Sequence, residues 1–371
     1  MAPVRLDLTA RLCEELGLFA REGVEVVSAR PASDELLLRV HEQDYVRAVQ
    51  AASADPRVAE AVFGLGTEDD PAFPGMHEAA ARIVGASVDL GLALLRGEAA
   101  HGVNFCGGMH HAKPGCASGF CVYNDAAVAM RAMLDAGAER VAYVDLDVHH
   151  GDGTEAVFWD DPRVLTISVH ESGTTLFPGT GYADELGGPD ALGSAVNLAL
   201  PAGVRDGDWL RAVHAVVPQL VRAFAPDVLV TQHGCDTHAL DPLGHFAVSV
   251  DAQRAVARSM HELAHEAAGG RWLALGGGGY EVVDVVPRTW AHLVAEASRQ
   301  PLEPATPVPP GWRRYVEELT GRPGPASMTD GGSATWTGWE SGYDPDAAVD
   351  RAVLATRRAA FPLHGLDPEF D

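Results

Sequence analysis

The sequence predicts an α/β fold with three layers, α/β/α, in which helices cover both faces of a mainly parallel central sheet. Two observations support this prediction. Nearly continuous apolar runs, such as Val141-Ala142-Tyr143-Val144 and Val228-Leu229-Val230, alternate with longer amphipathic segments. Such runs are typical of parallel strands that are buried on both faces. Polar, glycine-rich segments follow several of them, as expected for loops at the carboxyl ends of parallel strands, where the sites of these folds gather.

The predicted elements alternate along the first 300 residues. Strands are expected at residues 24–28, 102–105, 140–147, 164–170, 227–232 and 272–275. Helices are expected at residues 8–18, 77–95, 124–136, 206–224, 252–267 and 285–297. This alternation is typical of right-handed crossovers in a doubly wound sheet. We therefore expect residues 1–300 to form one catalytic domain. Residues 301–371, which contain proline, glycine and scattered tryptophans, are expected to be a C-terminal extension packed on it or wrapped around it.

The composition limits the classes of partner. The 371 residues include 27 Lys and Arg against 52 Asp and Glu, a formal net charge of −25. Such a surface repels phosphate backbones and anionic membranes, so we expect neither nucleic acid nor a membrane as partner. The five cysteines contain no C-x-x-C pair and favour reduced thiols over disulfides or a thiolate zinc site. Without a signal-peptide pattern or an apolar run of ~18 residues, the expected location is cytoplasmic.

Residues of metal-ligand type follow one of the predicted strands. Asp145, Asp147 and His149 alternate along the chain, so their side chains project to the same side of the strand end. Burying two carboxylates beside an imidazole is costly unless a cation compensates. One imidazole nitrogen with carboxylate oxygens suits a divalent metal and leaves a position open for water. A third ligand would come from the loop after another strand, where the spacing does not choose between Asp236 and Asp241.

Two other strand ends carry residues suited to acid–base chemistry and oxyanion binding. His110 and His111 are adjacent, and beside a metal-bound water one imidazole can be general base and acid while the other gives electrostatic help. Each would need a carboxylate to fix its tautomer, and Asp145 and Asp152 are the spare acids close by. Tyr280 follows four glycines, and its hydroxyl could stabilise a developing oxyanion. The glycines could instead cradle a phosphate, but the Lys-Ser/Thr of a Walker loop is absent.

The motifs as a set match a known family. In chain order they are His110-His111-Ala112-Lys113, Asp145-x-Asp147-x-His149-His150-Gly151-Asp152-Gly153, Phe177-Pro178-Gly179-Thr180-Gly181, Asp241-Pro242-Leu243 and Gly276-Gly277-Gly278-Gly279-Tyr280. They resemble the zinc-dependent histone deacetylases of the arginase–deacetylase superfamily from about residue 5 to about residue 297. Within that family the chain looks most like the bacterial acetoin-utilisation (AcuC-type) branch.

The resemblance implies roles for the residues at the reacting centre. Zinc, or ferrous iron, would be held by Asp147, His149 and Asp241, which selects the later of the two acids. His111 would be the general base and acid, with His110 as its electrostatic partner. Tyr280 would be the oxyanion donor. The two histidines would be oriented by carboxylates, Asp145 for His110 and Asp152 for His111.

The resemblance also implies residues around this centre. Gly119, Phe120 and Phe177 would line the narrow channel for the acyl-lysine stem. The rim acid that grips the substrate backbone would be Asp69 or its neighbour Glu68. Two structural cations, potassium or sodium, are usual in the family. The first would use Asp145, Ser168 and Val169 with the backbone of Asp147 and His149, and the second would use Phe158, Asp161 and Val164.

The predicted function is metal-dependent hydrolysis of the amide of an acylated amine, with acetyl-lysine in a protein such as acetyl-CoA synthetase as the expected substrate. Three alternatives stay open. The substrate could be a small-molecule amine, such as a natural product or a polyamine. A ureohydrolase would need a second metal, and Asp236 and His238 keep that idea open. The chain could also bind acyl-lysine without catalysis. The sequence gives no oligomeric state.

Overall fold

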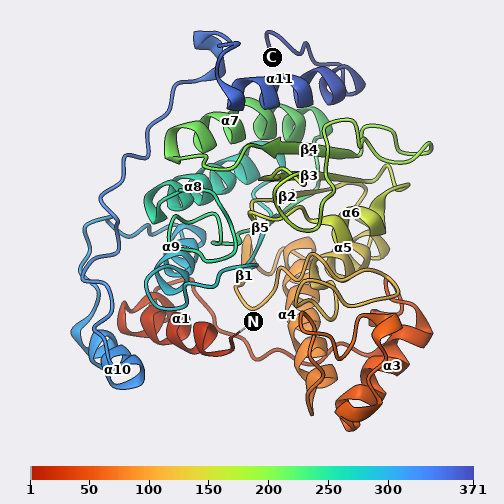
Figure 1. The fold of residues 1–371 in the computed structure, drawn as a ribbon, viewed down its shortest axis with the longest axis vertical. Coiled ribbons are helices and arrows are strands. Elements are labelled where there is room, and N and C mark those ends of the chain that lie inside the picture. The colour runs from red at the N-terminus through yellow and green to blue at the C-terminus, as the bar shows by residue number, and fades with distance from the viewer. Residues whose placement is uncertain (1) are drawn as a thin grey trace.

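The computed structural model describes residues 2–371 and has the expected three layers (Figure 1). Six strands form one sheet in the order β1-β6-β5-β2-β3-β4, and every neighbouring pair is parallel. The strands are β1 (His101–Asn104), β2 (Val141–Asp145), β3 (Val164–Glu171), β4 (Ala195–Leu200), β5 (Val228–Gln232) and β6 (Trp272–Leu275). From β2 the chain adds β3 and β4 on one side of the sheet and then β5 and β6 on the other, with β1 beyond β6. The adjacent ends of β2 and β5 are thus a topological switch point, where α/β folds bind ligands.

Helices cover both faces of the sheet. The α-helices are α1 (Val4–Glu15), α2 (Asp34–Leu37), α3 (Gln43–Ala54), α4 (Met76–Leu95), α5 (Asp125–Asp135), α6 (Asp152–Phe158), α7 (Asp206–Phe224), α8 (Val250–Ala267), α9 (Val286–Ala297), α10 (Pro310–Thr320) and α11 (Ala348–Ala360). Short 3-10 turns lie at Leu18–Ala20, Pro56–Val58, Ala61–Phe63, Trp339–Ser341 and Phe361–His364. Strand β2 explains why both faces need covering: Ala142 and Val144 join one apolar core with α7, α8 and α11, while Val141 and Tyr143 join a second with α4 and α5.

The predicted α/β/α class is confirmed, and most predicted elements are present to within a few residues. The prediction of a strand at residues 24–28 is wrong. In the described part of the chain this segment has no regular structure, and Val26 and Val27 are 65% and 57% exposed. Strand β4 has no counterpart among the predicted strands because Asn197, a poor strand former, interrupts its apolar run. Asn197 Nδ2 donates to Glu155 Oε2 at 2.7 Å, which gives this amide nitrogen a partner inside the fold.

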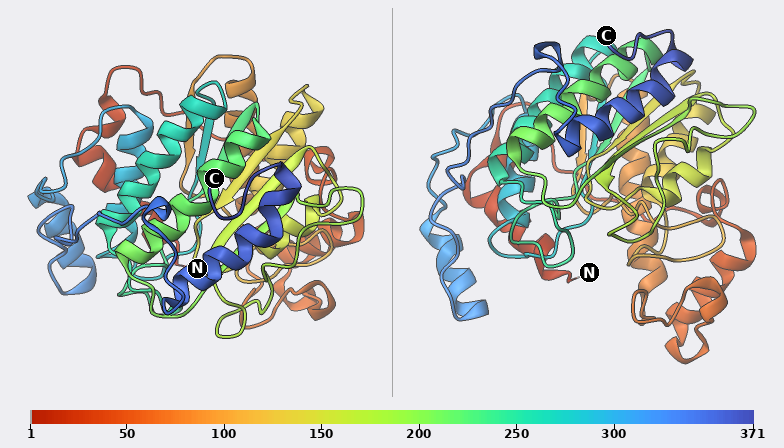
Figure 2. Two further views of the ribbon diagram at one scale, coloured as in Figure 1. Left: turned by 90° about the horizontal axis from the view of Figure 1, so that it is seen from above. Right: turned by 45° about the horizontal axis from the view of Figure 1, so that its top comes forward.

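Residues 301–371 contact the rest of the chain at both ends. Helix α10 lies against α1, where Trp312 Nε1 donates to the Leu8 carbonyl at 2.8 Å. Helix α11 lies against α7 and β4 (Figure 2). There the Arg211 guanidinium binds both carboxylate oxygens of Asp350 at 2.8 Å. The boundary at residue 300 between a catalytic domain and an extension stays a prediction.

Asp330 fastens the segment between α10 and α11. Its Oδ2 accepts hydrogen bonds from His238 Nε2 (2.9 Å) and Val250 N (2.8 Å), and its Oδ1 pairs with Arg288 (2.7 Å). Burial by itself raises the pKa of Asp330, but the bonds from His238 and Val250 and the charge of Arg288 outweigh it and lower that pKa below its ordinary value. The carboxylate is therefore more stable in the folded than in the unfolded chain.

We expect Asp330→Asn to lower the free energy of unfolding by about 2 kcal/mol at neutral pH, because an amide cannot replace both acceptor oxygens. The Asp330 contribution is fully present above the unfolded-state pKa of about 3.9 and is lost as the pH falls through the lower folded-state pKa. Urea denaturation at several pH values checks this. The difference between variant and wild type should be constant above about pH 5 and smaller near pH 3. The exposed Asp44→Asn is the control, and a difference that does not shrink in acid contradicts the assignment.

Two further expectations concern the whole chain. All five cysteines are unpaired in the structure, as expected. In the part of the chain that is described, no helix combines the length and the apolar character needed to cross a membrane.

Candidate active site

Four loops meet where neighbouring strands end. They follow β1, β6, β5 and β2, and they comprise residues 105–111, 276–280, 233–241 and 146–152. The last residues of β2 and β5, Asp145 and Gln232, are direct partners in the sheet. The loops with metal-ligand residue types therefore start side by side at the switch point, although the segments lie far apart in the sequence.

Asp147, His149 and Asp236 form a buried group in these loops. One ligand atom from each lies within 4.8 Å of the others. The Nδ1 atom of His149 is 3.1 Å from Asp147 Oδ1 and 3.2 Å from Asp236 Oδ2. Burial lowers the pKa of His149, but the two carboxylates outweigh it and raise that pKa to about 10. Two carboxylates that face one imidazole nitrogen therefore favour a cation at this position. A divalent metal of borderline hardness fits this donor set, which combines an imidazole nitrogen with carboxylate oxygens.

Glycines allow backbone to approach these carboxylates. The Gly278 amide donates to Asp147 Oδ2 at 2.8 Å. A Cβ atom at Gly278 would lie 1.9 Å from Asp236 Oδ2, and one at Gly234 would lie 2.0 Å from Asp147 Oδ2. Any side chain at either position would displace a carboxylate of the group. Because the glycine loop faces carboxylates, it is poorly suited to cradle a phosphate.

Asp241 lies next to this group. Its Oδ2 accepts from the Tyr280 amide at 2.8 Å and its Oδ1 from the Leu243 amide at 3.0 Å. Burial and the charge of Asp147 raise the pKa of Asp241 above its ordinary value, although the bonds from these amides act to lower it. Asp236 is enclosed more completely, and its Oδ1 accepts from Val148 N at 3.0 Å. The geometry thus leaves both acids as candidates for a third metal ligand, with Asp241 the one tied to Tyr280.

His110 and His111 lie beside the group with their ring centroids 4.0 Å apart. His110 Nδ1 is 2.8 Å from Asp145 Oδ2, and His111 Nδ1 is 2.7 Å from Asp152 Oδ1. An ionised carboxylate only accepts, so each Nδ1 carries the proton. His111 Nε2 is then free to accept a proton. The Nε2 of His110 lies 3.9 Å from Asp147 Oδ1, which places it toward the metal-ligand group.

The two imidazoles have opposite electrostatic environments. Burial lowers the pKa of His110, but Asp145 and Asp147 outweigh it and raise that pKa to about 9. Burial and the positive charge of His110 lower the pKa of His111 to about 3, against the effect of Asp152. Asp152 also forms an ion pair with Lys113 (Nζ–Oδ2 3.0 Å), which offsets part of its charge. Neighbouring groups whose pKa values are pushed apart are suited to different acid–base roles.

One aromatic ring and a glycine lie against His111, and a second aromatic ring lies against Tyr280. The ring of Phe177, 45% exposed, lies 5.0 Å from that of His111. The ring of Phe120 lies 5.8 Å from that of Tyr280. A Cβ atom at Gly119 would lie 2.4 Å from His111 Cδ2, and its φ of +55° also favours glycine. A side chain at Gly119 would therefore displace the imidazole.

Asp69 is exposed in the loop that follows the 3-10 turn Ala61–Phe63. A bond from Ala117 N to Phe63 O (2.9 Å) holds this loop against the segment that carries Gly119 and Phe120. Its neighbour Asp70 is buried, and burial together with the charge of Asp69 raises the pKa of Asp70 to about 7. Asp69 thus lies in a loop next to the predicted channel residues.

The residues predicted for a first structural cation lie together behind the reacting centre. Asp145 pairs with Ser168 across β2 and β3, and Val169 follows Ser168 in the strand. The Oδ1 atom of Asp145 accepts from the Asp147 amide at 3.2 Å. Ser168 Oγ accepts from the Gly151 amide at 3.3 Å.

The residues predicted for a second structural cation form consecutive turns after α6. The Asp161 amide donates to the Phe158 carbonyl at 3.0 Å, and the Val164 amide donates to the Asp161 carbonyl at 3.1 Å. The Asp161 carboxylate is bound by Arg131 and Arg163, at 2.9 Å and 2.7 Å. Backbone oxygens are therefore the groups left for an ion there. Both cation sites stay predictions.

Two residues outside the predicted set support carboxylates of the candidate site. Gln232 Nε2 donates to Asp147 Oδ2 at 2.7 Å, and Tyr143 Oη donates to Asp145 Oδ2 at 2.7 Å. The available signal in the sequence is a polar residue that ends an apolar strand, which is the position of Gln232. His150 contacts Thr180 through Nδ1 (2.9 Å) and Glu155 through Nε2 (3.3 Å), so both of its ring nitrogens have partners.

A candidate metal-ligand group with two buried histidine–aspartate pairs, at the switch point of a parallel sheet, is suited to metal-assisted hydrolysis. The comparisons with known proteins define the class. The model of the histone deacetylase domain matches residues 1–297. The chain therefore belongs to the histone deacetylase domain family, and it is a deacetylase, a hydrolase that acts on amide C–N bonds.

Individual relatives place the chain within that family. The acetoin utilization protein AcuC of Bacillus subtilis (strain 168) is 41% identical over 310 residues, which cover 83% of this chain and 79% of that protein. The protein of the same name from Staphylococcus xylosus is 36% identical over 312 residues, 83% of this chain and 80% of that one. The crystal structure of the HDA15 HD domain matches this chain with a TM-score of 0.76 at 28% identity. The match covers 98% of this chain and 90% of the HDA15 chain. The predicted resemblance to the AcuC-type branch is confirmed.

Proposed function

We propose that this deacetylase uses zinc to hydrolyse the amide of an acetyl-lysine in a protein, and that acetyl-CoA synthetase is a substrate. The observation that carries the proposal is the position of the His111–Asp152 pair beside a buried group of Asp147, His149 and Asp236 that could hold a metal ion. Membership of the histone deacetylase domain family supports an acylated amine as the substrate class, and acetyl-lysine is the acylated amine that we propose.

The metal would be held by Asp147, His149 and Asp241, with zinc or ferrous iron as the ion. Asp241 is favoured over Asp236 because its Oδ2 also accepts from the Tyr280 amide, so one loop would position both the ligand and the oxyanion donor. When bound, such an ion polarises the acyl carbonyl and lowers the pKa of water in the site. An ion of potassium or sodium at the first structural site would fix the loop after β2, and one at the second site would fix the turns after α6.

The reaction forms a bond from water oxygen to the acyl carbon and breaks the bond from that carbon to the amine nitrogen. His111 accepts the water proton at Nε2, because its Nδ1 is held by Asp152. The same Nε2–H then donates to the departing amine. His110 is held protonated by Asp145 and supplies a positive charge beside the developing oxyanion.

Tyr280 would donate its hydroxyl to that oxyanion. Burial, followed by the charges of Asp236 and Asp147, raises the pKa of Tyr280 well above its ordinary value. The phenol therefore keeps its proton and acts as a donor at neutral pH.

Substrate recognition would use the groups around His111. Phe120 and Phe177 offer apolar surface for the stem of an acyl-lysine, and Gly119 leaves room beside the imidazole. Asp69, an exposed acid, would accept hydrogen bonds from the substrate backbone. The ureohydrolase alternative is not favoured, because both ring nitrogens of His238 are bound, to Asp330 and to the Leu240 amide.

Tyr280→Phe should lower kcat on an acetyl-lysine peptide by ~10²- to 10³-fold, since it removes one oxyanion donor and keeps the ring. Acetate release measures the rate, and metal analysis with circular dichroism shows that site and fold persist. Tyr343→Phe, an exposed tyrosine, is the control. Near wild-type turnover by Tyr280→Phe would remove this residue from the mechanism.

The substrate class is tested by comparing acetylated proteins with small acetyl-amines. The protein is incubated with an acetylated cellular lysate, and lost acetyl marks are identified by mass spectrometry. Loss of marks from lysines of acetyl-CoA synthetase supports the proposal. A kcat/KM at least ~10-fold higher on an acetylated polyamine or other small amine than on acetylated protein would overturn it, because that is about 1.4 kcal/mol of transition-state preference.

A further inference from the structure

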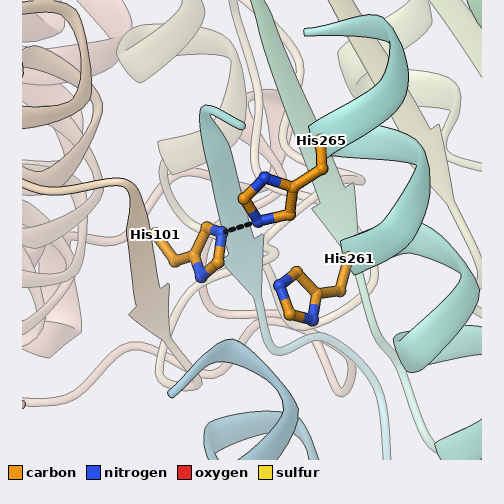
Figure 3. Close-up of side chains that lie close together, drawn as sticks. All are labelled: His101, His261 and His265. Atoms are coloured by element: carbon orange, nitrogen blue, oxygen red, sulfur yellow. Dashed lines mark hydrogen bonds between the residues drawn. The ribbon is translucent and has the colours of Figure 1, made fainter. Parts of the chain in front are cut away.

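Three histidines meet at the end of the sheet opposite the candidate active site. His101 is the first residue of β1, whereas His110 and His111 follow the other end of that strand. His261 and His265 lie one turn apart on α8 and face His101 (Figure 3). One ring nitrogen from each of the three lies within 4.8 Å of the others. The cluster is thus separate from the Asp147–His149 group and takes no part in the proposed hydrolysis.

The sequence around the two helical histidines reads His261-Glu262-Leu263-Ala264-His265. Histidines four residues apart lie on the same helical face, and the H-E-x-x-H spacing is one that binds zinc. The spacing alone is a weak signal, and here the structure adds a third imidazole from a neighbouring strand. Glu262 is exposed and pairs with Arg258 at 3.0 Å, so the motif supplies a pair of ligands.

Hydrogen bonds fix where the lone pairs of two rings point. His101 Nδ1 lies 2.6 Å from the Ala297 carbonyl, which can only accept, so the proton is on Nδ1 and Nε2 bears a lone pair. The Arg299 guanidinium, which can only donate, lies 3.3 Å from His265 Nε2 and defines that nitrogen as an acceptor. These two Nε2 atoms are 3.0 Å apart. Two lone pairs at this separation repel each other unless a cation lies between them.

The third ring has a nitrogen in need of a partner. His261 Nε2 is buried and has no hydrogen-bond partner among the described residues. The ring is held in place by stacking on Trp272, with centroids 5.6 Å apart and an angle of 6°, and its centroid is 4.6 Å from that of His101. A carbonyl that orients one histidine and an indole that orients another are the kind of outer contacts that fix metal ligands.

The surroundings allow an ion to enter. A surface hollow of about 370 Å³ is lined by His261, His265, Glu262, Glu296 and Arg299, together with Arg258 and Pro301. Glu296 has a buried Oε1 without a hydrogen-bond partner among the described residues, and its carboxylate offsets added positive charge. Burial lowers the pKa of His101, His261 and His265, so the rings are neutral at pH 7 and keep their lone pairs.

We propose that His101, His261 and His265 bind a divalent transition metal, such as zinc, nickel or cobalt, at a second site that links β1 to α8. Three imidazole nitrogens with water in the remaining position suit these borderline ions and exclude the harder magnesium and calcium. The Arg299 guanidinium competes with a metal for His265 Nε2, so its hydrogen bond to that nitrogen must break when the metal binds.

The test counts metals per chain in the full-length protein after incubation with excess zinc and gel filtration. The double variant His261→Gln/His265→Gln should hold one zinc fewer than wild type, and its deacetylase activity should stay within about twofold, since a linkage between sites of less than 0.5 kcal/mol is expected. His364→Gln, a histidine elsewhere, is the matched control. Co²⁺ should give visible bands for a tetrahedral site in wild type that the double variant lacks.

A second variant keeps the proposal testable if the double variant folds poorly. Arg299→Ala should bind the second zinc severalfold more tightly in calorimetry, because a competing donor and a positive charge are removed. Equal zinc counts in wild type and the double variant would overturn the proposal, as would unchanged affinity in Arg299→Ala. This test does not depend on the deacetylase proposal, because it counts only the zinc ions that the protein loses when His261 and His265 are replaced.

Discussion

Replacing His111 with glutamine should lower kcat on an acetyl-lysine peptide by ~10²- to 10⁴-fold and leave the metal content of the protein unchanged. Glutamine retains a donor toward Asp152 but offers no basic nitrogen in place of Nε2. The fold should persist, because the amide can still bond the carboxylate that lies 2.7 Å from the imidazole. Steady-state kinetics with metal analysis of the same sample measure both quantities.

Comparing the turnover of other variants with that of His111→Gln separates loss of the base from a general disturbance of a buried site. His364→Gln should have no effect on turnover. Asp152→Asn should cost less than His111→Gln, since it leaves the base in place and alters only its orientation and tautomer. Activity of His111→Gln within about tenfold of wild type would show that another group moves the proton.

Asp241→Asn should lower the zinc count by one and abolish deacetylation with it, whereas Asp236→Asn should keep the metal. The first carboxylate is the proposed ligand. Loss of a ligand should weaken metal binding by more than the ~10- to 100-fold that loss of an outer partner costs. Asp236→Asn should act on stability, because Asp236 accepts from Val148 N and adjoins His149 in a fully buried position.

Two measurements made on both variants decide between the acids. Zinc content after dialysis gives the ligand, and urea denaturation gives the change in stability. Asp236→Asn is expected to lose about 2 kcal/mol or more, as a buried acceptor is altered. If Asp236→Asn loses the zinc and Asp241→Asn retains it, the group of Asp147, His149 and Asp236 is itself the metal site, and Asp241 only positions Tyr280.

Strand positions were predictable where burial on both faces leaves a continuous apolar run. Trp272–Leu275 is matched at both ends for this reason. The same rule fails at Asn197, whose partner Glu155 lies 42 residues earlier in the chain, and at Val26 and Val27, which are apolar but exposed. Burial is a property of tertiary packing, and local sequence only suggests it.

The part of the site that lies along one strand could be predicted, whereas the part that depends on loop geometry could not. Alternation along a strand is a local property, so the sequence alone indicates that Asp145, Asp147 and His149 share one side. The choice between Asp236 and Asp241 depends on loop geometry that spacing does not encode, and the structure keeps both near the group. Gln232 was not predicted because its partner Asp147 is 85 residues away and an amide has no metal-ligand signature.

The histidine cluster could likewise be predicted only in part. The spacing of His261 and His265 is visible in the sequence, but the third imidazole is more than 150 residues away and joins them only because β1 pairs with β6 beside α8. Spacing along a helix therefore indicates a pair of ligands, and only the fold completes the set.

The most direct test of the account is the dependence of deacetylation on metal. Protein stripped with a chelator is titrated with zinc while acetate release from an acetyl-lysine peptide is followed. We expect no turnover without metal and recovery of full activity on adding zinc, with His111→Gln inactive throughout. Wild-type turnover by metal-free protein, or no acetate from the zinc-loaded protein, would contradict it.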